Sequence, residues 1–136
     1  MGLVYTELTL RNAIDVGFAK LGNITEEEIR QTTVRALVDT GAGNLVINEA
    51  IREKLGLPFG GTSRGTLADG TKVGYQYVGP VEVIWKDRFY SGVVILLPDT
   101  DEVLLGAIPL QAMDLMVHPK SEELVGVHGD EVLQRL

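Results

Sequence analysis

The sequence predicts a mainly β domain whose sheet is closed or strongly curled. The chain contains about eight short runs rich in β-branched, aromatic and other apolar residues, each typical of a strand. Glycine-bearing turns separate several of these runs. Only residues 48–55 carry a full set of helix signals. We expect one domain over residues 1–136, a length that can bury a substantial core.

Composition and charge exclude several classes of function. Hydrophobic residues make up 45% of the chain and charged residues 23%, as in soluble globular proteins. The formal net charge of −7 argues against a nucleic-acid partner. Without cysteine the chain has no disulfide framework and no thiol nucleophile. No apolar stretch is long enough to cross a bilayer, and no signal-peptide pattern is present, so we expect a cytoplasmic protein without a membrane partner.

The first part of the chain predicts two strands joined by a long connection. Residues 3–10 alternate loosely and include β-branched side chains, which favours a strand. Residues 12–31 contain two glycines and lack a sustained period, so they are expected to form a connection, with one helical turn after Thr25. Residues 32–38 are β-branched and apolar and predict the second strand.

The next elements are a short strand over residues 45–47 and a helix over residues 48–55. Asn48 is a good N-cap, and Gly56 followed by Pro58 stops the helix. A helix of about two turns is not stable alone in water, so this one is expected to pack on the sheet.

The second half of the chain is expected to be largely strands. Residues 65–73 carry Asp69-Gly70 between two strand-like halves, which is a strong hairpin signal. Residues 81–85 alternate as a strand with one buried face, whereas residues 89–97 are almost continuously apolar and predict a strand covered on both faces. The remaining predicted elements are an apolar run over 103–106, a short helix over 108–114, strands over 116–118 and 124–127, and a C-terminal tail over 129–136.

One stretch, residues 36–42, joins an apolar run directly to Asp39, Thr40 and Gly41. Burying an isolated carboxylate is costly, so an acid at this point is either a solvated turn residue or a functional group held in place. The tripeptide Asp39-Thr40-Gly41 alone is a weak signal, so the choice between these two interpretations depends on the sequence features around it. Downstream lie the glycine-bearing hairpin, then Leu104-Leu105-Gly106 and a short helix.

In the order and spacing of these three features, the chain resembles the retropepsin family, the single-domain aspartic proteases of retroviruses, retroelements and some bacteria. The resemblance covers residues 34–115, and the stretch 105–110 is most similar to the bacterial members. It implies a closed or curled β-barrel with one or two short helices that acts as a two-fold homodimer on a peptide or protein substrate.

The resemblance also implies roles for individual residues. Asp39 is similar to the catalytic aspartate, and Thr40 to the residue whose hydroxyl locks two subunits together. Gly41 corresponds to the glycine that lets the backbone approach the catalytic water and the substrate, and Gly106, after Leu105, resembles the glycine that supports the catalytic loop. The residues implied to contact substrate are Ala42, Leu67, Ala68, Asp69 and Gly70.

The chemistry implied by the resemblance needs two chains. Peptide hydrolysis by carboxylates alone requires a pair that shares one proton, so that one member accepts a proton from water and the other polarises the carbonyl. The sequence contains a single Asp-Thr-Gly, at Asp39, so the second carboxylate has to come from a second copy. Two alternatives remain open: a catalytically silent dimeric domain used for protein interaction or assembly, and a protease that cleaves only itself or one partner.

The sequence departs from the family pattern at several positions. Retroviral enzymes commonly pair an acid with an arginine where this chain has Gly43 and Ala107, and both charges are absent together. The connection over residues 12–31 is longer than in compact retroviral enzymes, and the hairpin tip is more acidic. His118 and His128 are the only histidines, and without cysteine partners they predict no metal site; no cofactor is expected either.

Overall fold

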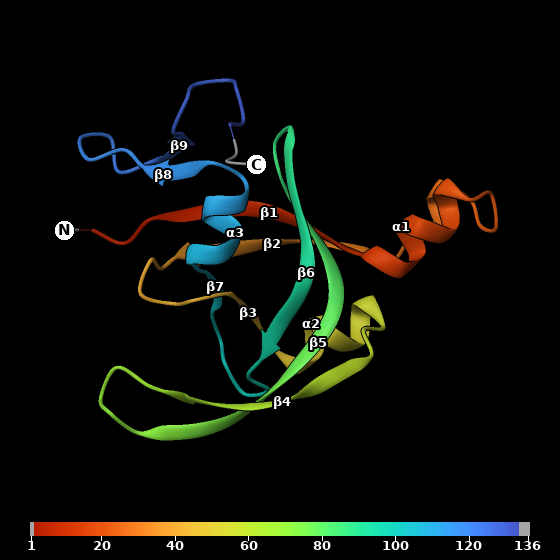
Figure 1. Ribbon diagram of the computed structural model, residues 1–136, viewed down its shortest axis with the longest axis horizontal. Helices are drawn as coiled ribbons and strands as arrows, with labels where there is room; N and C mark the ends of the chain where they lie inside the picture. Colours follow the sequence, from red (N-terminus) through yellow and green to blue (C-terminus); the bar gives the residue numbers. More distant parts are fainter. Residues whose placement is uncertain (1, 134–136) are drawn as a thin grey trace.

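Six strands close into a barrel in the computed structural model, which describes residues 2–133 (Figure 1). Their order around the barrel is β1-β2-β7-β3-β6-β5, and pairing of β5 with β1 closes it. The barrel strands are β1 (Tyr5–Asn12), β2 (Gln31–Val38), β3 (Leu45–Ile47), β5 (Lys72–Trp85), β6 (Arg88–Leu96) and β7 (Val103–Leu105). The mainly β fold class is therefore confirmed.

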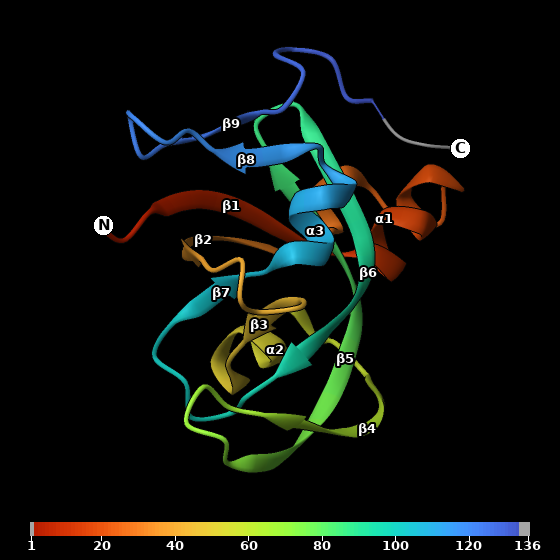
Figure 2. The same ribbon diagram turned by 60° about the vertical axis from the view of Figure 1, so that its left-hand side comes forward.

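Two hairpins extend the barrel in opposite directions (Figure 2). β4 (Phe59–Thr66) pairs only with β5 and forms the open edge of the sheet, with a bulge between Phe59 and Gly61. β8 (Leu115–Val117) and β9 (Leu124–Gly126) form a separate two-stranded sheet on the other side of the barrel. The short helices are α1 (Ala13–Lys20), α2 (Glu49–Leu55) and α3 (Ala107–Ala112), with one 3-10 turn, η1 (Glu26–Glu28).

The barrel interior is filled by the inward side chains of alternating strand residues. Leu8 and Leu10 of β1 and Val83 of β5 are fully buried, as the period of two requires. Trp85 belongs to the same core, and its Nε1 donates to Thr6 Oγ1 at 2.9 Å, so the polar end of the buried indole is satisfied.

The strand β6 differs from the expectation of two covered faces. Phe89 and Val93 are 66% and 45% exposed, while Val94 and Leu96 face the core. The prediction that both faces of this strand are covered is therefore wrong. Within residues 2–133, no further layer covers its outward-facing residues.

The connection over residues 12–31 contains a helix that the sequence reasoning missed. Asn12 caps α1, its Oδ1 accepting from the amides of Ile14 and Asp15 at 2.9 and 3.1 Å. An amphipathic period is missing because α1 buries only Asp15 and Val16. The expected turn after Thr25 is confirmed as η1, which carries a capping box with Glu28. With α1, residues 2–133 contain three short α-helices, whereas the resemblance implied one or two.

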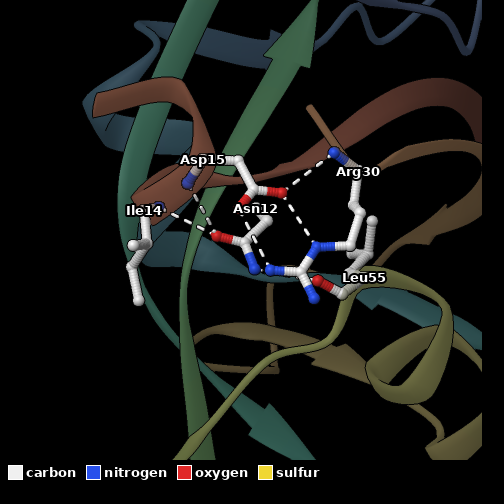
Figure 3. Close-up of polar contacts among 5 residues, drawn as sticks. All are labelled: Asn12, Ile14, Asp15, Arg30 and Leu55. Carbon is white, nitrogen blue, oxygen red and sulfur yellow. Dashed lines mark hydrogen bonds and ion pairs between the residues drawn. The ribbon is translucent and has the colours of Figure 1, made fainter. Parts of the chain in front are cut away.

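A polar cluster anchors this insertion to the rest of the fold (Figure 3). Arg30 donates to both carboxylate oxygens of Asp15, from Nε at 2.9 Å and Nη2 at 3.0 Å. The Asn12 side-chain amide donates to the carbonyl of Leu55, the last residue of α2, at 2.8 Å. The cluster therefore connects α1 and the segment after η1 to the C-terminal end of α2.

Replacing Asp15 with asparagine should destabilise the fold at neutral pH and not in strong acid. The Arg30 hydrogen bonds hold the pKa of Asp15 below its ordinary value. Such a group contributes stability above its unfolded pKa of about 3.9 and loses that contribution as the pH falls through its folded pKa. We expect Asp15→Asn to cost about 1–2 kcal/mol near neutral pH. Urea unfolding of both proteins at about pH 7 and about pH 2.5 measures this difference.

The exposed acid Glu27 of η1 supplies the matched control for this prediction. Glu27→Gln removes the same charge from the same segment and should change stability by less than about 0.5 kcal/mol. An Asp15→Asn cost that is equal at both pH values would contradict the ionic origin of the effect.

Other predictions from the sequence are confirmed at α2 and left open at the tail. α2 is capped by Asn48, whose Oδ1 accepts from the amide of Ile51, and it ends at Gly56 in the left-handed conformation. The predicted tail over residues 129–136 is described only to residue 133; residues 134–136 lie outside the described part. Within residues 2–133, no helix has the length and apolar character needed to span a membrane.

Candidate active site

The end of β2 places Asp39 beside the end of β7. Val38 lies opposite Leu105 in the parallel β2–β7 pair, and the Asp39 amide donates to the Leu105 carbonyl at 3.0 Å. The chain then turns tightly: the Ala42 amide donates to the Asp39 carbonyl at 3.1 Å, and the Gly41 amide donates to Asp39 Oδ1 at 3.0 Å. The carboxylate is thus oriented by the backbone of its own loop, half-buried and open to solvent.

The glycine of the second motif lets a strand pass close behind this loop. A Cβ on Gly106 would lie 2.4 Å from the Asn44 carbonyl oxygen and 2.6 Å from that of Ala42. Real Cβ atoms do not approach backbone oxygens this closely, so any larger residue would displace the loop. Gly106 therefore lies in close contact with the loop that carries Asp39.

The start of α3 fixes the same loop by hydrogen bonds. The first amides of a helix have no partner inside the helix. In α3, the amide of Ala107 donates to the Ala42 carbonyl at 2.8 Å and the amide of Ile108 to the Gly43 carbonyl at 3.0 Å. These two main-chain hydrogen bonds anchor the loop at Ala42 and Gly43. Gly43 and Ala107 are also the positions where retroviral enzymes commonly carry a charged pair, so here main-chain bonds join the two segments.

A cleft of about 610 Å³ lies between the Asp39 loop and the β4–β5 hairpin. Its walls carry mainly apolar side chains, which suit the side chains of an extended peptide. The loop contributes Asp39, Gly41, Ala42 and Gly43, and the hairpin contributes Gly65, Thr66, Leu67, Ala68, Val73 and Tyr75. The other lining residues are Val46, Ile95, Leu97 and Leu104.

The tip of the hairpin is a tight, exposed turn. The Leu67 amide donates to the Thr71 carbonyl at 2.8 Å, and Gly70, at φ +86°, donates back to the Leu67 carbonyl at 2.9 Å. The Asp69 carboxylate accepts from the Thr71 amide at 2.9 Å, and the side chain and amide of Thr71 lower the pKa of Asp69. Asp69 is therefore a turn-stabilising acid that stays ionised in mild acid.

The predicted site residues fall into three places. Asp39, Gly41, Ala42, Leu67 and Ala68 line the cleft together. Asp69 and Gly70 lie at the exposed tip and do not line the cleft, and Thr40 is exposed beside Asp39. Leu105 and Gly106 are buried behind the loop. The fold thus brings Asp39 and the hairpin, which are far apart in the sequence, to the same side of the barrel.

Sequence reasoning missed most of the apolar lining. Val46, Ile95 and Leu104 belong to strands that were predicted, yet their orientation toward the cleft depends on the register between strands far apart in the chain. Tyr75 was missed because the predicted hairpin ended at Val73, whereas β5 continues to Trp85. Within residues 2–133, no group of three or more His, Asp or Glu side chains is arranged to hold a metal ion.

Comparison with known proteins identifies the family to which the chain belongs. A search of curated proteins finds no match to the chain. A family model described as aspartyl protease matches residues 25–108, which include Asp39, the whole hairpin and Gly106. Because this match covers more than half of the chain, the protein belongs to the aspartyl protease family.

Proposed function

We propose that the protein is an aspartic endopeptidase whose active site is completed by a second copy of the chain. The observation that supports this most directly is the position of Asp39, which stands in an apolar cleft opposite a hairpin and is held by its own loop backbone. The sequence offers no second Asp-Thr-Gly, so a two-fold dimer is the simplest source of the second carboxylate.

In the proposed mechanism, the two Asp39 carboxylates share one proton, because two carboxylates in contact do not both ionise easily. The ionised member accepts a proton from a water molecule, which attacks the scissile carbonyl carbon. The protonated member donates its proton to the carbonyl oxygen, which gives a gem-diol intermediate. The carbon–nitrogen bond then breaks as the proton taken from water passes to the leaving amine, and a hydroxyl of the intermediate returns a proton to the carboxylate pair. The pair titrates as a unit, so the rate should show a bell-shaped profile with its optimum in acid to mildly acid solution.

The β4–β5 hairpin is proposed to act as a flap that closes over the bound peptide. Its tip carries Leu67 and Ala68 toward the cleft and leaves Asp69 and Gly70 exposed. Closure would exclude water from the reacting groups and complete the apolar walls around the substrate side chains.

Replacing Gly70 with valine should reduce activity more than stability. Gly70 has φ +86°, where a β-branched residue is strained, and open space surrounds it. If the tip has to keep this conformation in order to close, a strain of about 1–2 kcal/mol should lower kcat/KM by about ten-fold. Peptide cleavage rates and urea unfolding of the same preparation measure the two effects.

Gly22 provides a control with the same backbone strain in another place. It has φ +79° and open space around it, and it follows α1 in the chain. The helix α1 lies on the opposite side of the molecule from the turn between β4 and β5 (Figure 1). Gly22→Val should lose stability to a similar extent and keep kcat/KM. A Gly70→Val protein that unfolds outright would show that the hairpin has a structural role instead.

A subunit-mixing experiment tests whether the site is shared. Asp39→Asn is nearly isosteric, so mutant and wild-type chains should associate at random. In an equal mixture about a quarter of the dimers would then be wild type on both sides, and activity per wild-type chain should fall to about half. The two forms are refolded together at fixed total concentration, and initial cleavage rates are measured at several concentrations.

The outcome separates three possibilities. Activity strictly proportional to the wild-type fraction, where dimers form and exchange, would mean that each chain carries a complete site. Dimers that cleave nothing in a broad peptide library at mildly acid pH would favour the silent interaction domain. Cleavage of the chain itself, with the library left intact, would favour the self-processing protease.

A further inference from the structure

Asp114 occupies a hub between the barrel and the C-terminal segment. It lies between α3 and β8 in the left-handed conformation, at φ +56°. Its backbone carbonyl accepts from the Val127 amide at 2.8 Å and from Arg88 Nη1 at 2.9 Å. One residue thus receives hydrogen bonds from β6 and from the chain that follows β9.

The Asp114 carboxylate holds the same C-terminal segment from its other side. Oδ2 lies 2.6 Å from His128 Nδ1 and accepts from the Leu133 amide at 3.3 Å. The Asp114 side chain is 11% exposed and that of His128 is 47% exposed, so water reaches the imidazole and leaves the carboxylate largely shielded. The neighbouring His128 lowers the pKa of Asp114, which keeps the carboxylate ionised well into acid solution.

Arg88 fixes the base on which this pair rests. Its side chain is buried, and it donates to the carbonyls of Met113, Asp114 and Gly129. These bonds join β6 to both ends of the C-terminal hairpin and do not change with pH, because a guanidinium remains protonated throughout the accessible range. The titratable part of the hub is therefore the contact between Asp114 and His128.

We propose that Asp114 and His128 form a proton-dependent latch that holds residues 127–133 against β6 and β8. The latch is closed when an imidazolium faces the carboxylate and loosens when the imidazole loses its proton. This inference concerns a region away from the Asp39 cleft and does not depend on the peptidase proposal.

The expected pH range follows from the two partners. A free imidazole titrates at about 6.5, and a free aspartate at about 3.9. The ion pair is present where the imidazole is protonated and the carboxylate ionised, so the latch should be tightest in mildly acid solution and weaken as the pH rises past neutrality. Strong acid should open it as well, by protonating Asp114.

Within residues 2–133, few other charged groups surround the pair. Arg88 faces Asp114 from β6, and Glu131 follows His128 in a short backbone bridge. Lys86, Asp87 and Asp130 line a neighbouring cavity of about 300 Å³ at the β5–β6 turn. The variants described below therefore test each partner of the pair separately.

Hydrogen exchange followed by NMR tests the latch in the full-length protein. The amides of Val127 and Leu133 report on it, because both donate to Asp114. Their protection factors, each referred to an unstructured peptide of the same sequence, should fall about three- to five-fold between about pH 5.5 and about pH 8.5. Amides of the barrel core, such as that of Leu10, should show no such step.

Variants of each partner make the assignment specific. His128→Gln keeps a polar side chain that does not titrate, so protection should be low and independent of pH. Asp114→Asn removes the charge while keeping a residue that tolerates the left-handed conformation, and it should abolish the step without unfolding the protein. His118→Gln is the control, since His118 Nδ1 accepts only from the amides of Lys120 and Ser121; it should retain the full step.

Two results would overturn the proposal. One is a pH step that persists in His128→Gln or disappears in His118→Gln. The other is equal protection of Val127 and Leu133 at both ends of the pH range in the wild-type protein.

Discussion

Replacing Asp39 with asparagine should lower the rate of peptide cleavage by about a thousand-fold or more while leaving the fold intact. In the proposed dimer of mutant chains both carboxylates are replaced by amides, which cannot accept the proton of the attacking water and leave no pair to share a proton. Asn keeps the shape of the side chain, and its oxygen can still accept from the Gly41 amide, so the loop geometry should survive. Initial rates on a peptide selected from a library, together with urea unfolding of the same protein, measure the two effects.

Asp87 provides the control for the loss of one aspartate charge. It is exposed in the turn between β5 and β6, and Asp87→Asn should retain wild-type kcat/KM. Equal cleavage by the wild-type and Asp39→Asn proteins would remove the assignment of the enzyme, or reveal a contaminating protease.

Replacing Gly106 with alanine should destabilise the protein by about 3 kcal/mol. The added methyl group would lie 2.4–2.7 Å from backbone atoms of Asn44 and Ala42, and backbone cannot swing aside as the end of a long side chain can. Relief of the overlap requires the Asp39 loop to move away from α3, which would break the bonds that Ala107 and Ile108 donate to it. Urea unfolding at equal protein concentration measures the loss.

Gly43 belongs to the same loop and supplies the matched comparison. A Cβ added there meets nothing within 4 Å. Gly43→Ala should therefore change stability by at most about 1 kcal/mol in either direction. Similar effects of the two substitutions would show that the close approach at Gly106 is not what holds the loop.

Local signals in the sequence predicted most of the barrel. Capping residues located α2 and η1, and alternation or β-branched runs located the strands, because these signals act between residues close in the chain. The helix α1 was not predicted, because it is stabilised by the polar cluster of Asn12, Asp15 and Arg30, which produces no apolar period in the sequence. Phe89 and Val93 were misjudged because exposure depends on what covers a strand, which the strand itself does not encode.

The site was predictable where a motif identifies residues and unpredictable where it depends on register. Asp39, Gly41 and Gly106 could be named from short patterns, since each has a local chemical or steric reason. The apolar walls could not, because whether Ile95 or its neighbour Leu96 faces the cleft is set by pairing with β3 and β5. The sequence therefore named candidate site residues and left the shape of the cleft undetermined.

The open edge at β4 has a consequence for how the protein behaves in concentrated solution. One side of this strand carries backbone amides and carbonyls that no strand within residues 2–133 covers. Such an edge invites strand-by-strand aggregation between copies. In β4 the bulge after Phe59 interrupts the regular edge, and Arg64 places a positive charge on it, two features that natural sheets use against aggregation. The hairpin can thus stay uncovered beside the cleft without favouring strand pairing between copies along β4.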